Sequence, residues 1–451
     1  VAGMGQQAEV RPFPGYENHL SDRIAPLPRL LREAGYHTYT VGKWHLGTAE
    51  EHSPAAAGFE RSFSLLQGGA NHFNASNYSP SGATYREDGR QVDWPEGRYS
   101  TDLYTDRLIE FIDSADDDRP FFAYAAYTSP HWPLQVPEDE LDRYRGRYDA
   151  GYDVLREERF ASLQRAGIIP ASSTLPPRNP AIRPWDDLSD DEKRVESRKM
   201  ELYAAMVENL DHHVGRLIEH LKARGLYDNT LIVFMSDNGA AGEDFHATRA
   251  YVRDHFDNSY ENMGRPTSFV SYGPPWAEAG SAPFSRYKGY TREGGIVAAM
   301  IVSGPGLAGR GTRTSAYATV MDIAPTLLER AGATYPTDGS VRPLLGESLA
   351  PLLAGQREAV HDDGYVTIFL QGDLGFLRQG RWKISNIIEP FDWDRDDLGP
   401  IDESTFELFD VVADPGETTN LAGKEPERFA EMLRLWRQHR AALGILYADG
   451  S

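Results

Sequence analysis

Apolar runs typical of β-strands alternate with helical patterns along most of this chain, and this alternation limits the folds that it can adopt. A long helix is predicted from about 189 to 224, where Ser189 and Glu192 have the spacing of a capping box. Strands that alternate with helices form a mostly parallel sheet covered on both faces. We therefore predict an α/β fold with a large mixed, mostly parallel sheet sandwiched by helices. The predicted strands are 36–41, 121–127, 231–235 and 296–302.

The pattern changes near residue 355, and this change predicts a second, smaller domain. Short alternating strands followed by one helix are typical of an antiparallel sheet with a packing helix. We predict a large α/β domain over 1–355 and a small C-terminal α+β domain over 356–451. The elements expected in the second domain are strands at 364–370, 375–384 and 405–411 and a helix at 426–443.

Three further features of the first domain are predicted. The segment 231–235 is almost wholly apolar, as a central parallel strand should be. The proline-rich, polar segment 134–185 is interpreted as a surface excursion. A helix is expected over 322–331, with Asp322 as its N-cap.

The composition excludes several classes of function. The net charge is −22, which opposes binding to nucleic-acid phosphates and to anionic membrane surfaces. No apolar run reaches the roughly 18 residues of a membrane span, so we expect a soluble protein. The chain has 0 cysteines, so no disulfide, thiolate zinc site or cysteine nucleophile can come from it.

Four loops near the ends of the predicted strands carry side chains suited to chemistry, although each has an ordinary structural explanation. A lysine or histidine in a loop is commonly a solvated charge or a local hydrogen-bonding group. An Asp-Asn pair after a strand is commonly an Asx turn, but it also supplies two hard oxygen ligands for Ca²⁺ or Mg²⁺. The candidates are Lys43, His45, His131, Asp237, Asn238 and Lys288.

Together these candidates indicate one site, because the carboxyl ends of parallel strands meet at one edge of a sheet. A hard metal ion with two lysines and two histidines would suit a small oxyanion ester. The cations would neutralise its charge, and a histidine would protonate the leaving oxygen. His212 and His213 are different, because adjacent helical positions diverge by about 100°. We interpret them as surface or packing residues.

Several segments resemble motifs of the sulfatase family, within the alkaline-phosphatase-like superfamily, and the similarity spans nearly the whole chain. The longest match, residues 35–47, resembles the second sulfatase signature. The other matches resemble the family's His loop at 129–133, its metal strand at 234–239, its second lysine loop at 288–295, and its C-terminal strand and turn at 407–410, 414–415 and 420–421.

The resemblance implies a role for each candidate. Lys43 would contact both the nucleophile and the sulfate, and His45 would hydrogen-bond the nucleophile. His131 and Lys288 would hold the sulfate and assist the departing oxygen. Asp237 and Asn238 would be two of the four protein ligands of a Ca²⁺ ion.

The chain departs from the family pattern at its start. Members begin with a strand ending in two metal-binding Asp residues, followed by Cys-x-Pro-x-Arg or Ser-x-Pro-x-Arg. A formylglycine-generating or equivalent maturation enzyme converts the first residue of that motif to formylglycine. The nearest match here, Thr174 to Arg178, has the wrong nucleophile. We therefore expect the chain to lack the first strand and the nucleophile, as a fragment or degenerate copy with little turnover.

The resemblance predicts hydrolysis of small aryl or alkyl sulfate esters, as in bacterial arylsulfatases. Two alternatives stay open: a phosphonate or phosphodiester hydrolase of the same superfamily, and a non-catalytic anion- or carbohydrate-binding relic. The expected partners are the sulfate ester and the maturation enzyme, with no nucleic acid and no membrane span. The expected location is the bacterial cytoplasm or periplasm.

Overall fold

The computed structural model describes residues 14–389 and 400–447. Its largest sheet has the strand order β4-β3-β2-β1-β5. Strand β1 runs parallel to both β2 and β5, whereas β3 and β4 continue the sheet in antiparallel fashion. The predicted mixed sheet is therefore confirmed. The strands are β1 (His37–Lys43), β2 (Arg61–Leu65), β3 (Tyr85–Glu87), β4 (Arg90–Val92) and β5 (Phe121–Ala126).

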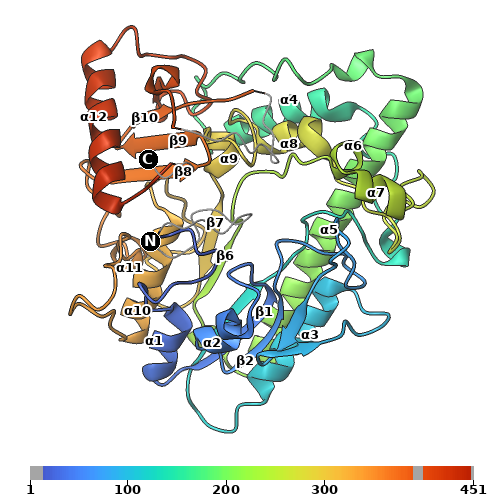
Figure 1. The fold of residues 1–451 in the computed structure, drawn as a ribbon, viewed down its shortest axis with the longest axis vertical. Coiled ribbons are helices and arrows are strands. Elements are labelled where there is room, and N and C mark those ends of the chain that lie inside the picture. The colour runs from blue at the N-terminus through green and yellow to red at the C-terminus, as the bar shows by residue number, and fades with distance from the viewer. Residues whose placement is uncertain (1–13, 390–399, 448–451) are drawn as a thin grey trace.

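Helices cover both faces of this sheet (Figure 1). On one face, Tyr39 and Val41 of β1 pack in one core cluster with Leu108 of α3 (Ser100–Asp113). On the other face lie α1 (Leu27–Glu33) and α2 (Pro54–Ala57). Side chains of a strand alternate between faces, and Phe122 of β5 packs against α1. This alternation explains why both helical layers are needed.

Strand β6 (Ile232–Met235) does not occupy the predicted central position. It pairs antiparallel with β7 (Met300–Ser303) in a separate two-stranded sheet. Phe234 is 46% exposed and Ile301 is 63% exposed. The prediction of a central parallel strand is therefore wrong for the described residues, because apolar composition indicates a tendency to be buried but not the neighbour that buries the strand. The predicted strand start at 296 is also corrected, since α9 (Glu293–Ile296) is helical.

The segment 134–185 is not the polar surface excursion that was predicted. It contains α4 (Gly151–Arg165), and its residues Tyr152 and Trp185 are buried. Their rings pack edge-on against Trp276 of α8 (Gly273–Ser281), with Tyr152 and Trp276 centroids 5.6 Å apart. Widely spaced aromatic residues supply the core of this region, and their burial depends on α8, which is distant in the sequence.

The C-terminal sheet is antiparallel throughout, with order β11-β10-β9-β8. Helix α12 (Pro426–Leu443) has the predicted bounds, and its buried Trp436 packs with Ile384 and Leu408 of the sheet. The predicted strand 375–384 is in fact two strands. The sheet consists of β8 (Val366–Gln371), β9 (Leu374–Gln379), β10 (Trp382–Ser385) and β11 (Glu407–Asp410).

Two helices lie in the sequence between β7 and β8, namely α10 (Ile323–Ala331) and α11 (Ala350–Leu353). Asp322 was predicted as the N-cap of α10, but its side chain does not cap that helix. Instead, Asp322 accepts hydrogen bonds from the backbone and hydroxyl of Thr319. The domain boundary at 355/356 stays a prediction.

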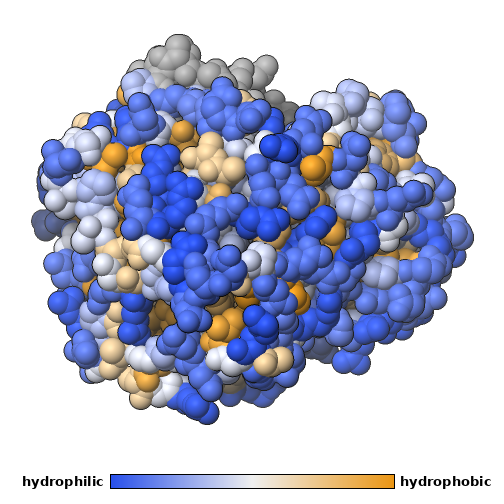
Figure 2. All heavy atoms as spheres, turned by 90° about the horizontal axis from the view of Figure 1, so that it is seen from below, coloured by the Kyte–Doolittle hydropathy of each residue, from blue (hydrophilic) through white to orange (hydrophobic). Residues whose placement is uncertain are grey.

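The face seen from below is mostly hydrophilic, with apolar residues in small groups (Figure 2). This surface agrees with the acidic, strongly charged composition. Within residues 14–389 and 400–447, we find no helix with the length and apolar character needed to cross a membrane.

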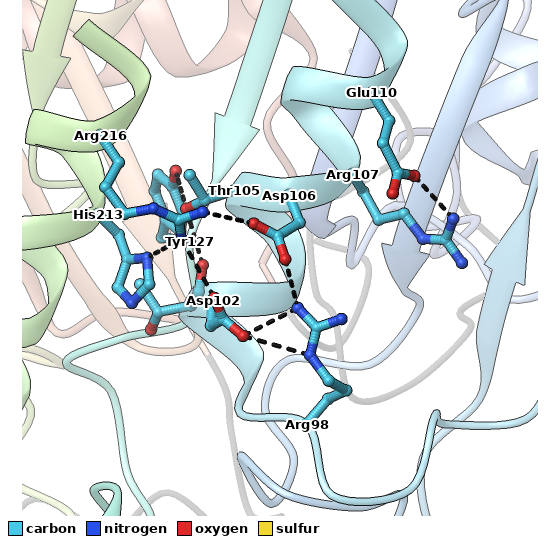
Figure 3. Close-up of polar contacts among 10 residues, drawn as sticks. Arg98, Asp102, Thr105, Asp106, Arg107, Glu110, Tyr127, His213 and Arg216 are labelled. Atoms are coloured by element: carbon cyan, nitrogen blue, oxygen red, sulfur yellow. Dashed lines mark hydrogen bonds and ion pairs between the residues drawn. The ribbon is translucent and has the colours of Figure 1, made fainter. Parts of the chain in front are cut away.

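Helix α5 (Asp190–Ala223) begins at the predicted capping box and is joined to α3 by a charged network (Figure 3). Arg216 of α5 donates to Asp102 and Asp106 of α3 at 3.1 and 2.7 Å. His213 contacts Arg216 with its Nδ1 2.9 Å from Nη1, and burial, reinforced by Arg216, lowers its pKa to about 4. His213 is therefore a neutral packing residue, and His212 is exposed.

Candidate active site

Lys43 is the last residue of β1, and Gly42 sets the path of the chain before it. A Cβ atom at Gly42 would lie 2.0 Å from the carbonyl oxygen of Ala126, and its φ is +93°. Only glycine accepts this close approach without strain. The half-buried Lys43 amine has a lowered pKa, first because of burial and then because of Lys288.

His45 follows in a left-handed backbone conformation, with φ of 54°. Its imidazole packs directly against Gly68, where an added Cβ would lie 2.6 Å from Cε1. Burial, followed by the charges of Lys43 and Lys288, lowers the pKa of His45 to about 4. His45 is therefore neutral near pH 7 and suited to hydrogen-bond a hydroxyl group.

His131 lies in the loop after β5, where its own backbone orients the ring. Its Nδ1 is 3.0 Å from the carbonyl oxygen of Trp132. Since a carbonyl only accepts, Nδ1 carries the proton, and Nε2 is the acceptor that faces Lys288 Nζ at 3.4 Å. Burial holds the pKa of His131 well below its usual range, and Lys288 and Lys43 lower it further.

A buried polar network beneath His131 was missed by the sequence reasoning. The Nε2 of His72 lies 3.2 Å from the His131 carbonyl oxygen, and its Nδ1 lies 2.6 Å from the hydroxyl of Ser100. The side chain of Gln135 accepts a hydrogen bond from the His72 backbone and donates to the carbonyl of Ser268. This network fixes the loop that carries His131. His72 and Gln135 were missed because neither lies in a recognisable local sequence motif.

Lys288 faces the Nε2 atom of His131 and is paired with an acidic residue. Its Nζ lies 2.9 Å from Glu243 Oε1, and Glu243 is buried. The second oxygen, Oε2, is also buried and has no hydrogen-bond partner in the part of the chain that the structure describes. Glu243 therefore belongs to the site. The sequence does not distinguish it from the adjacent Asp244, because its burial depends on packing between distant loops.

Asp237 and Asn238 follow β6, and they differ in exposure. Asp237 is exposed and interacts electrostatically with Lys43, whose pKa it raises against the larger effect of burial. Asn238 is half-buried, and its side-chain amide donates to the carbonyl of Gly239 at 2.9 Å. Ca²⁺ prefers roughly 6–8 oxygen ligands. Within residues 14–389 and 400–447, no group of three or more His, Cys, Asp or Glu side chains could hold a metal, so this pair alone does not fit a calcium site.

The structure thus brings four predicted residues together and places a fifth beside them. Lys43 and Lys288 interact electrostatically with each other and with both His45 and His131, and Asp237 interacts with Lys43. Asn238 adjoins Asp237 in the chain. Two cations beside two neutral imidazoles form an environment that can hold a tetrahedral oxyanion and donate hydrogen bonds to its oxygens.

Anion binding at this cluster is expected to take up protons. A bound sulfate would offset the charges of Lys43 and Lys288, and would therefore raise the pKa of His131, which is lowered in the free protein. Calorimetric titration with sulfate at pH 6, in buffers of different ionisation enthalpy, should give a net uptake of up to about one proton per site. Proton release, or no transfer at any pH from 5 to 8, would contradict this electrostatic description.

Comparison with known proteins supports the same interpretation. A family model described as Sulfatase matches residues 2–333. An uncharacterized sulfatase of Schizosaccharomyces pombe is 37% identical over 99% of this chain and 84% of its own length. An arylsulfatase of Klebsiella aerogenes is also 37% identical, over 75% of each chain.

A solved structure extends the likeness to the fold. The crystal structure of Ps i-CgsB in complex with k-i-k-neocarrahexaose matches 97% of this chain and 78% of its own, with a TM-score of 0.64 and 22% identity. At this identity the likeness establishes the architecture alone. That architecture is the mixed α/β sheet with a C-terminal antiparallel sheet described above.

Proposed function

Because the chain belongs to the sulfatase family, we propose that it forms most of the active site of a hydrolase for aryl or alkyl sulfate esters. The observation that carries this proposal is the convergence of Lys43, His131 and Lys288, with Lys288 Nζ 3.4 Å from His131 Nε2. The 37% identity to an arylsulfatase supports the same reaction class.

We assign separate tasks to these side chains. Lys43 and Lys288 bind and orient the sulfate group, because two ammonium groups offset its negative charge in a partly desolvated place. The bound sulfate offsets the lysine charges that lower the pKa of His131, so Nε2 of His131 takes up a proton and gives it to the ester oxygen as that oxygen departs. His45, neutral because its pKa is about 4, hydrogen-bonds the attacking hydroxyl group. Glu243 holds Lys288 toward His131 through the 2.9 Å contact.

The nucleophile is not among the residues assigned above, since the sequence contains neither Cys-x-Pro-x-Arg nor Ser-x-Pro-x-Arg. We propose that a formylglycine from outside these residues, made by a maturation enzyme, provides the hydrated aldehyde that attacks sulfur. The open strand edges support this proposal. Tyr124 of β5 is 48% exposed, and Phe234 and Met235 of β6 are 46% and 36% exposed.

These two edges are suited to receive a further apolar strand. Strand β5 ends the five-stranded sheet, and β6 has β7 as its sole partner among the described residues. Exposed apolar strand edges are liable to pair with other chain segments. A strand between β5 and β6 would cover both edges and join the two sheets, and its end would lie beside Lys43 and Asp237, at the ends of β1 and β6.

Calcium is a further proposal, in which Asp237 and Asn238 supply two of the ligands and the added segment supplies the others. The 451-residue chain is therefore expected to bind Ca²⁺ weakly or not at all. One carboxylate and one amide face the positive charges of Lys43 and Lys288, which oppose a second cation. Calorimetric titration with Ca²⁺ should show no site that Asp237→Ala removes. Micromolar binding abolished by Asp237→Ala would refute this expectation and would indicate that another carboxylate, such as Glu243, completes the site.

The proposed activity can be tested with the naturally encoded protein, produced with a formylglycine-generating enzyme. Initial rates would be measured for para-nitrophenyl sulfate and for a matched para-nitrophenyl phosphonate ester. We expect sulfate ester hydrolysis with the higher kcat/KM. A preference for the phosphonate would assign the protein to phosphonate hydrolysis instead. Binding of both esters without turnover, despite formylglycine detected by mass spectrometry, would indicate a non-catalytic anion-binding protein.

A further inference from the structure

A cluster of buried charges lies between the C-terminal sheet and the loop that carries Lys288. The side chain of Lys383 on β10 is fully buried, at 0% exposure. Its Nζ lies 2.7 Å from Glu293 Oε1 and 3.0 Å from Glu417 Oε1. Glu417 also accepts a hydrogen bond from the backbone N–H of Glu293 at 2.6 Å. Lys383 thus contacts the side chain of Glu293, and Glu417, which follows β11, contacts its backbone.

Neighbouring contacts strengthen the attachment. The hydroxyl of Thr291 donates to the carbonyl of Asn386 at 3.1 Å. Arg292 pairs with Glu407, and its guanidinium lies 4.2 Å from the ring centroid of Phe409. Together with the contacts of Glu293, these interactions fix residues 291–293 against β10, β11 and the segments that follow each of these strands.

The anchored segment is connected to the active site by short backbone hydrogen bonds. Gly294 donates to the carbonyl of Ser285 at 3.0 Å, which closes the loop around Lys288. Lys288 itself donates from its backbone to Ala240 at 3.0 Å, and Gly239 donates to Gly295 at 3.1 Å. Backbone hydrogen bonds therefore join residues 285–295 to residues 237–240.

The two faces of β10 suggest that the buried charges do more than stabilise the fold. On one face, Ile384 packs in the apolar core with Trp436. On the other face, Lys383 replaces what could be an apolar contact with a buried ion pair. Burying a charge carries a desolvation cost that an apolar side chain avoids. Charged groups in fixed geometry specify one position of a loop more strictly than apolar packing, which is non-directional.

We propose that Lys383 and Glu417 are positioning residues, which hold Lys288 and the Asp237–Asn238 loop in place from the C-terminal sheet. The proposal rests on the proposed function for the task that Lys288 performs. The positional part, that the cluster orders residues 285–295 and 237–240, is independent of any activity. The C-terminal sheet accordingly contributes to the position of the residues that form the site.

The positional part is tested by hydrogen–deuterium exchange of the 451-residue chain, followed by mass spectrometry of peptides covering 285–297 and 237–240. Glu417→Gln keeps the shape of the side chain but weakens the pair, and Lys383→Met removes the cation. Both variants should speed exchange in these peptides by about tenfold or more. The matched control is Ile384→Ala, which damages the opposite face of the same strand and should act mainly on peptides of the C-terminal sheet and α12.

Two outcomes would overturn the proposal: unchanged exchange at 285–297 in both charge variants, or equal acceleration by Ile384→Ala at equal loss of thermal stability. A kinetic measurement on the active protein adds an independent check. Glu417→Gln should lower kcat/KM for para-nitrophenyl sulfate several-fold, whereas Ile384→Ala should not. If the wild type shows no sulfatase activity and the exchange still responds to the charge variants alone, the proposed function fails while the positional inference stands.

Discussion

Replacing Lys43 with methionine is expected to lower kcat/KM for para-nitrophenyl sulfate by about 10²–10³-fold in the formylglycine-containing protein. Methionine keeps most of the length of the side chain but removes the positive charge that we place against the sulfate. The remaining lysine, Lys288, is shared with Glu243 at 2.9 Å and cannot replace this charge. Steady-state kinetics at fixed pH would measure the loss.

The matched control is Lys222→Met on α5, which removes an equal charge from an exposed position. The Lys222 side chain is 47% exposed and pairs with Glu219 at 2.7 Å. Its substitution should leave kcat/KM unchanged within about twofold, because exposed charges act weakly over long distances in salt. A similar small effect for Lys43→Met would remove Lys43 from the sulfate site.

Replacing His131 with alanine should cost most for esters with poor leaving groups. His131 is assigned to protonate the departing oxygen, and the need for that proton grows with the pKa of the leaving group. The loss is expected to rise toward about 10²–10⁴-fold for the least acidic phenols and to be small for the most acidic. Lys288→Ala should show the same trend, since its Nζ lies 3.4 Å from His131 Nε2.

A series of aryl sulfates with leaving groups of graded pKa would measure this dependence. The slope of log kcat/KM against leaving-group pKa should be steeper for both variants than for the wild type. His212→Ala is the control, because His212 is exposed on α5 and should leave the slope unchanged. An equal loss across the whole series would show that neither His131 nor Lys288 serves the departing oxygen.

Much of the fold could be predicted because its signals are local. The capping box at Ser189 and Glu192 gave the start of α5, and the apolar repeat gave its length. Helix α12 has the predicted bounds, because a helix of 18 residues carries several turns of periodic pattern. The loops of Lys43, His131 and Lys288 were predicted to meet, because they follow or flank strands and resemble family motifs.

The remaining features depend on contacts between distant segments, which no local pattern encodes. The apolar sequence of β6 predicted a central strand, but β6 pairs only with β7 among the described residues, and Phe234 is exposed. Glu243 and Asp244 look equivalent in the sequence, and the position of Lys288 alone distinguishes them. Tyr152 and Trp185 appeared to lie in a polar excursion, yet Trp276 of α8 buries both.

The central claim is that Lys43, His131 and Lys288 form one binding site for a sulfate ester, and ligand binding tests it without requiring turnover. Calorimetric titration of the 451-residue chain with para-nitrophenyl sulfate would be compared with the Lys43→Met/Lys288→Met double variant and with Lys222→Met. We predict one site per chain in the wild type and in Lys222→Met, and at least a tenfold weaker affinity in the double variant. Equal affinity in all three proteins, or no binding by the wild type, would contradict the claim.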